Sequence, residues 1–124
     1  MPSANNKILI VEDDVIISHI IELQLKKLGY IVSGIAANGQ DAITLMNNTN
    51  PDAILMDIFL DGKMDGIEAA KIIKEKFNIP IIFLTAYSDD NVLERIRTIQ
   101  SAQYVLKPFT NEDLRIALKL SLGW

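Results

Sequence analysis

The chain has 124 residues, which is enough for one domain with its own hydrophobic core and too few for two. It contains no cysteine and only one histidine, which excludes disulfides, thiol catalysis, thiolate zinc sites and multi-histidine metal sites. The net charge of −4 argues against sequence-independent binding to nucleic acid, and no apolar run approaches the roughly 20 residues that span a membrane. The short polar start lacks the features of a signal peptide, so we expect a cytoplasmic protein. We expect one domain over residues 1–124, with a flexible segment at 1–6.

Short apolar runs rich in β-branched residues alternate with amphipathic segments along the chain. In the first half, these patterns predict strands over 7–11, 30–36 and 53–57, and helices over 15–28 and 40–48. Asp14 is the expected N-cap of the first helix, and Gly29 follows its end. In the second strand we expect Tyr30, Val32 and Ile35 to face the core.

In the second half, the same patterns predict helices over 65–77 and 88–99 and strands over 81–85 and 103–106. Asp65 is expected to cap the first of these helices. Thr110 opens the last helix, and Asp113 stands three residues on, at the spacing of a capping box.

The predicted order is five repeats of a strand followed by a helix. Such alternation predicts a parallel sheet with helices on both faces, because each crossover must return the chain to the same edge. The expected fold is therefore a flavodoxin-like (βα)5 three-layer sandwich with strand order 2-1-3-4-5. In that order the topological switch point lies between strands 1 and 3.

The C-terminal ends of parallel strands meet at one edge of the sheet. The polar residues delivered to that edge are Glu12, Asp13, Asp14, Asp57, Thr85 and Lys107. We expect the carboxylates to repel one another, with no base paired to them, and a hard divalent cation such as Mg²⁺ to relieve the repulsion. Asp14 is better explained as a helix cap than as a ligand.

Asp57 ends a buried strand, and on its own it fits a loop-capping role as well as a chemical one. Its neighbours at the edge favour phosphoryl chemistry. Asp57 would be an oxygen nucleophile that forms an aspartyl phosphate, with Mg²⁺, Lys107 and the Thr85 hydroxyl each holding one phosphoryl oxygen.

Five segments in this order resemble the receiver domain of two-component response regulators. They are 8–14 (ILIVEDD), 55–57 (LMD), 64–66 (MDG), 84–86 (LTA) and 104–109 (YVLKPF). The resemblance covers almost the whole chain, and it implies that Asp57 is the phosphoacceptor. One departure is the loop 58–64, which lacks the proline of many receivers and has one residue more before its Asp-Gly.

The resemblance also implies ligands for Mg²⁺, with Mn²⁺ or Ca²⁺ as substitutes. Asp13, Asp57 and the backbone carbonyl of Phe59 would bind directly, and Glu12 through water. Thr85 and Tyr104 match the switch residues of the family and Lys107 its lysine, whose bond to Pro108 is expected to be cis.

A receiver of this kind takes its phosphoryl group from a histidine kinase or a histidine phosphotransfer protein and signals to an unknown downstream target or output domain. It would be a switch that assists its own phosphorylation and dephosphorylation, rather than an enzyme. The alternative is a receiver-like interaction module that works without phosphorylation.

One further pattern has two interpretations. Ile16, Ile20 and Leu23 form a second apolar stripe beside the core face of the first helix. The stripe is either a widened core face or a docking face for the phosphodonor.

Overall fold

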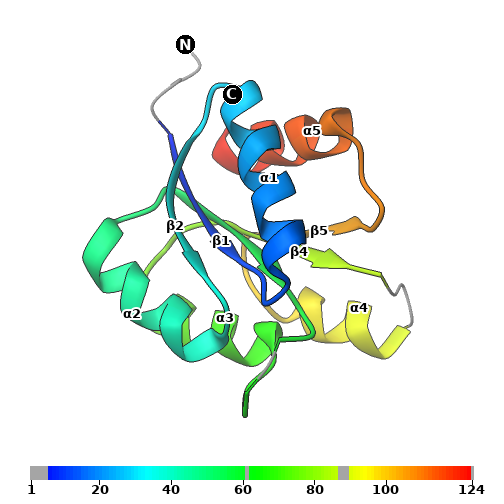
Figure 1. Ribbon diagram of the computed structural model, residues 1–124. Helices are drawn as coiled ribbons and strands as arrows, with labels where there is room; N and C mark the ends of the chain where they lie inside the picture. Colours follow the sequence, from blue (N-terminus) through cyan, green and yellow to red (C-terminus); the bar gives the residue numbers. More distant parts are fainter. Residues whose placement is uncertain (1–5, 61, 87–89, 124) are drawn as a thin grey trace.

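The computed structural model describes residues 6–60, 62–86 and 90–123. Strands and helices alternate along it (Figure 1). The elements are β1 (Lys7–Val11), α1 (Val15–Lys27), β2 (Ile31–Ala36), α2 (Gly39–Thr49), β3 (Ala53–Asp57), α3 (Gly66–Lys76), β4 (Ile81–Thr85), α4 (Asp90–Arg97), β5 (Ala102–Leu106) and α5 (Asn111–Leu122). Among the described residues, no helix has the length and apolar character needed to cross a membrane.

The five strands form one parallel sheet in the order β2-β1-β3-β4-β5, which confirms the predicted fold. Helices α1 and α5 cover one face, and α2, α3 and α4 cover the other (Figure 1). The central strands β3 and β4 are buried along their whole length, since helices pack on both of their faces. The core therefore consists of two apolar layers, one on each side of the sheet.

Side-chain caps fix the starts of the helices. Asp14 accepts hydrogen bonds from the backbone N–H groups of Ile16 and Ile17, as predicted for an N-cap. Asp65 forms a capping box with Glu68 at the start of α3. The box predicted at Thr110 and Asp113 is also present.

The second strand differs from its prediction. Tyr30 is buried but precedes β2, and Ile35 is exposed instead of facing the core. The register of β2 against β1 shifts by one residue, because Ile8 pairs with Val32 and Leu9 pairs with Gly34. The bulge keeps Ile35 on the same side of the sheet as Val32, since Ile35 pairs with Ile10 and Val32 with Ile8. Ile35 is nevertheless exposed because β2 is the edge strand of the sheet.

Helix α4 is shorter than predicted. The expected start at Ser88 lies outside the described residues, and the helix ends at Arg97 instead of Ile99. The backbone N–H of Ile99 donates to the carbonyl of Ile96, so the chain tightens beyond the helix end while the Ile99 side chain stays in the core.

The second stripe of α1 is not part of the core. Ile16 is 73 % exposed and Ile20 is 50 % exposed, and Leu23 is exposed as well. The widened-core interpretation is therefore wrong.

Candidate functional site

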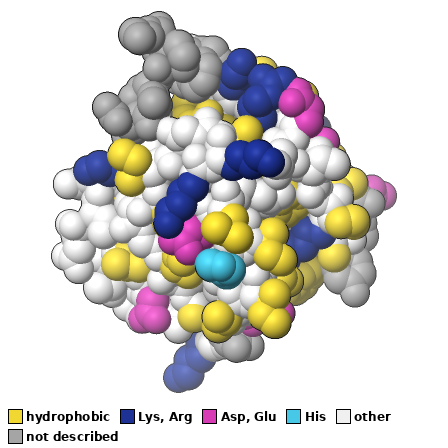
Figure 2. Space-filling view, turned by 45° about the horizontal axis from the view of Figure 1, so that its top comes forward, with side chains coloured by type: hydrophobic (Ala, Val, Ile, Leu, Met, Phe, Trp, Pro, Cys, Tyr) yellow, Lys and Arg dark blue, Asp and Glu magenta, His cyan; other side chains and the backbone are white. Residues whose placement is uncertain are grey.

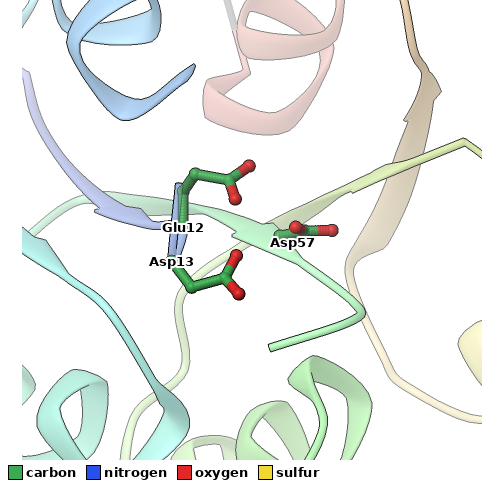
Figure 3. A group of neighbouring side chains, drawn as sticks. All are labelled: Glu12, Asp13 and Asp57. Atoms are coloured by element: carbon green, nitrogen blue, oxygen red, sulfur yellow. The ribbon is translucent and has the colours of Figure 1, made fainter. Parts of the chain in front are cut away.

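Three carboxylates meet at the carboxyl edge of the sheet. Val11 pairs with Met56 in the β1–β3 register, so the residues that follow them, Glu12 and Asp57, end neighbouring strands. Together with Asp13, they offer oxygens that all lie within 4.8 Å of one another (Figure 3). Glu12 and Asp57 are buried, and Asp13 is half-buried.

The ammonium group of Lys107 joins this cluster from the end of β5. Its Nζ lies 3.1 Å from Oε1 of Glu12 and 3.4 Å from Oδ2 of Asp57. The expectation that no base pairs with the carboxylates is therefore wrong. The backbone N–H of Lys107 donates to the carbonyl of Thr85, which extends the β4–β5 register to this point, and the Lys107–Pro108 bond is cis, as predicted.

Burial dominates the electrostatics of Glu12. It raises the pKa of this carboxyl from 4.5 to about 7, assisted by the neighbouring carboxyl groups of Asp13 and Asp57, while a backbone hydrogen bond from Asp14 and the Lys107 ammonium oppose the rise. Burial by itself lowers the pKa of Lys107, but its contacts with Glu12 and Asp57 outweigh burial, and the net pKa is raised. Lys107 is therefore a fixed positive charge near neutral pH.

The raised pKa of Glu12 gives a pH dependence to stability. The folded chain holds this proton more tightly than the unfolded chain, so the stabilising contribution is complete below pH 4.5 and is lost as the pH rises to about 7. We expect Glu12→Gln to gain on the order of 2 kcal/mol in free energy of unfolding relative to wild type between pH 5 and pH 8. Urea denaturation in EDTA measures this difference, and a difference that does not change with pH would refute the assignment.

The remaining predicted site residues lie at different depths. Thr85 is fully buried at the end of β4, one position beyond the partner of Asp57 in the β3–β4 register. Tyr104 in β5 is 44 % exposed, so it is not a core residue. Phe59 follows β3 with its side chain 53 % exposed, and Asp14 is exposed, engaged as the helix cap.

Gly66 is a site residue that the sequence analysis missed. It is the first residue of α3, and its N–H donates to the carbonyl of Ile58. A Cβ at this position would lie 2.1 Å from the carbonyl oxygen of Asp57, which is impossible without movement of the backbone. Only glycine lets the start of α3 lie directly against the backbone of Asp57.

The donor set suits a hard divalent cation. Three carboxylates within reach of one another supply the oxygen ligands that Mg²⁺ prefers, and the chain contains no cysteine whose thiolate would favour a softer metal. Lys107 neutralises part of the negative charge through its contacts with Glu12 and Asp57, and among the described residues Asp13 has no ion pair of this kind.

Comparison with known families shows which family the chain belongs to. The family model of the response regulator receiver domain matches residues 8–119, which is most of the chain. The chain is a receiver domain. Proteins of this family are signalling switches and generally bind Mg²⁺ at an acidic pocket, and this chain has an acidic cluster made by Glu12, Asp13 and Asp57.

Individual relatives agree with this assignment. The receiver domain is 36 % identical over 117 residues to the transcriptional regulatory protein PdtaR of Mycobacterium tuberculosis, covering 94 % of this chain and 57 % of that protein. It therefore spans little more than half the length of this curated relative.

Solved receiver structures superpose closely on the fold. The N-terminal domain of a response regulator/sensory box/GGDEF protein from Carboxydothermus hydrogenoformans matches with a TM-score of 0.84 and 39 % identity, over 94 % of each chain. The BeF3-activated receiver domain of RstA from Klebsiella pneumoniae matches with a TM-score of 0.85 and 31 % identity, over 96 % of this chain and all of that one.

Proposed function

We propose that this receiver domain is a phosphoacceptor switch in which Asp57 takes a phosphoryl group from a phosphohistidine in a Mg²⁺-dependent reaction. The observation that carries the proposal is the position of Lys107 Nζ, which contacts both Asp57 and Glu12 beside the acidic cluster. A carboxylate nucleophile with an ammonium group at hydrogen-bonding range has two groups that phosphoryl transfer requires, namely an attacking oxygen and a donor to the transferring oxygens.

In the proposed reaction an Asp57 oxygen attacks phosphorus, the O–P bond forms, and the P–N bond to the partner's imidazole breaks with its electron pair on nitrogen. Lys107 is placed to hold one phosphoryl oxygen, and the hydroxyl of Thr85 to hold another. Asp13 and Asp57, with the carbonyl of Phe59 and with Glu12 through water, would hold Mg²⁺. When bound, the cation would offset the negative charge of the carboxylates and of the phosphoryl oxygens.

The signal would leave through α4 and β5. We expect the phosphoryl group to draw the Thr85 hydroxyl inward and Tyr104 to turn toward the space vacated, as a shift between two existing states. A cavity of about 540 Å³ lies between α4 and β5, with Tyr104, Leu93 and Ile99 in its lining. A change in Tyr104 would alter the shape of this cavity and so its fit to a downstream partner.

Labelling with a small phosphodonor tests the proposal. With acetyl phosphate and Mg²⁺, intact-mass spectrometry should show the gain of one phosphoryl group, and both EDTA and Asp57→Asn should abolish it. An unlabelled wild type would favour the alternative, a receiver-like interaction module that acts without phosphorylation.

The exposed stripe of α1 is the proposed docking face for a histidine kinase or phosphotransfer protein. Figure 2 shows hydrophobic side chains around the single histidine of the chain, His19, and the exposed residues here include Val15, Ile16, Ile20 and Leu23. A mainly apolar cavity of about 420 Å³ continues from Ile20 to Phe109 and reaches Lys107. A partner seated on this face would present its phosphohistidine beside the acidic cluster.

A charged residue in this face should affect only the protein donor. We expect Ile20→Asp or Ile16→Asp to slow transfer from a histidine-phosphorylated partner by about tenfold or more, because a docked charge would be desolvated without a counter-charge. Labelling by acetyl phosphate should not change. Leu120→Asp on exposed α5 is the matched control, and equal losses with both donors would exclude the docking role.

The cytoplasmic location stays a prediction from the sequence.

A further inference from the structure

An ion pair joins α4 to the start of α3 across 30 residues of sequence. Nη2 of Arg95 donates to Oδ2 of Asp65 at 2.7 Å. The two helices cover the same face of the sheet (Figure 1). Both side chains are partly buried, so solvent screens this pair less than a fully exposed one.

Asp65 is a rigid anchor for this contact. Its Oδ1 accepts the backbone N–H of Glu68, and its own N–H donates to the Glu68 side chain, each at 2.9 Å. One oxygen of the carboxylate therefore caps α3 while the other receives Arg95. A change in the position of Arg95 is transmitted to the first turn of α3 instead of being absorbed by rotation of a free side chain.

The anchor lies next to the backbone of the proposed phosphoacceptor. Gly66 follows Asp65, donates to the carbonyl of Ile58 at 2.7 Å, and lies against the carbonyl of Asp57 too closely for a Cβ. Arg95, Asp65 and Gly66 thus form a continuous connection from α4 to Asp57.

Among the described residues, helix α4 contributes few side chains to the core. It is eight residues long, and the buried side chains that it contributes to the core are Val92 and Ile96. Its other described ion pair, Arg97 with Glu94, lies within the helix itself and cannot tie α4 to another element.

We infer that the Arg95–Asp65 ion pair is a latch that holds α4 against the loop after β3 and opposes displacement of this helix. The consequence for signalling rests on the proposed function. If phosphorylation of Asp57 favours a state with α4 displaced, the latch raises the free energy of that state relative to the state in which the ion pair is intact. By linkage, a ligand of Asp57 and a partner at the α4–β5 cavity then affect each other's binding through the same contact.

Hydrogen exchange of the unphosphorylated protein tests the latch without reference to phosphorylation. Arg95→Gln and Asp65→Asn both remove the ion pair, and asparagine retains the N-cap of α3. Each variant should speed amide exchange in α4 about three- to tenfold, with α3 unchanged, and the double variant should exchange no faster than either single one. Arg97→Gln is the matched control on the same helix and should change the rate less than twofold. Unchanged exchange in α4, or additive effects of the two substitutions, would overturn the latch.

Binding of beryllium fluoride with Mg²⁺, measured by calorimetry, tests the coupling to Asp57. Both latch variants should bind this phosphoryl analogue more tightly, by the same factor as their gain in α4 exchange, and Arg97→Gln should bind like wild type. Unchanged affinity in variants with faster α4 exchange would overturn the coupling. A wild type that binds no beryllium fluoride would contradict the proposed function, and the exchange data would still decide whether the latch restrains α4.

Discussion

Replacing Lys107 with methionine is expected to slow phosphorylation of Asp57 by acetyl phosphate about 10²- to 10³-fold, the usual cost of removing one donor to a transferring group. Methionine keeps most of the length and apolar volume of the lysine stem but cannot donate. The ammonium group contacts Asp57 and Glu12 from the side of β5, where the described residues of the site offer no other cation. The rate of phosphoprotein formation measures the effect.

A second measurement on the same variant separates catalysis from metal binding. Removal of a positive charge makes the cluster of Glu12, Asp13 and Asp57 more negative, so Mg²⁺ should bind at least as tightly as in wild type. Lys63→Met, on the exposed loop after β3, is the matched control and should leave both properties unchanged. Near-normal phosphorylation of Lys107→Met would contradict the role given to Lys107.

Replacing Gly66 with alanine is expected to lower the free energy of unfolding by about 3 kcal/mol or more, although alanine normally stabilises a helix relative to glycine. The added Cβ would lie 2.1 Å from the carbonyl oxygen of Asp57, so either α3 or the end of β3 must move. Since β3 carries the phosphoacceptor, the fraction of protein that still folds should also be phosphorylated more slowly. Urea denaturation and acetyl phosphate labelling measure the two effects.

Gly34→Ala provides the matched control. Its Cβ would meet the side chain of Leu45 at 3.4 Å, an ordinary contact with a flexible group, so we expect a change within about 1 kcal/mol. A Gly66→Ala variant as stable as wild type would show that α3 adjusts its approach to Asp57 without cost.

The order of the strands was predictable because each apolar run is bounded by turn residues and every crossover contains a helix. The same logic places Glu12, Asp57 and Thr85 at one edge, since strand ends in a parallel sheet coincide. It failed at Ile35, because β2 is the edge strand of the sheet, where a side chain on the same side as Val32 is still exposed.

Contacts between distant side chains were less accessible from the sequence. Because strand ends meet at one edge of the sheet, Lys107 was expected near the acidic cluster. That reasoning did not show that its ammonium group pairs with Glu12, 95 residues earlier in the chain. Gly66 was read only as part of a motif, because its closeness to Asp57 depends on the packing of α3. Arg95 follows the pattern of a solvent-exposed helical charge, and its partner Asp65 appears only once α3 and α4 are placed side by side.

The most direct test of the central claim is to identify the atom that carries the phosphoryl group. Borohydride reduces an aspartyl phosphate to homoserine, so wild-type protein treated with acetyl phosphate and Mg²⁺, reduced and digested can be mapped by mass spectrometry. Homoserine at position 57, and at no other carboxylate, is the expected result. A phosphorylated protein with homoserine at Asp13 or elsewhere, or a protein that takes up no phosphoryl group at all, would contradict the assignment of Asp57 as the nucleophile.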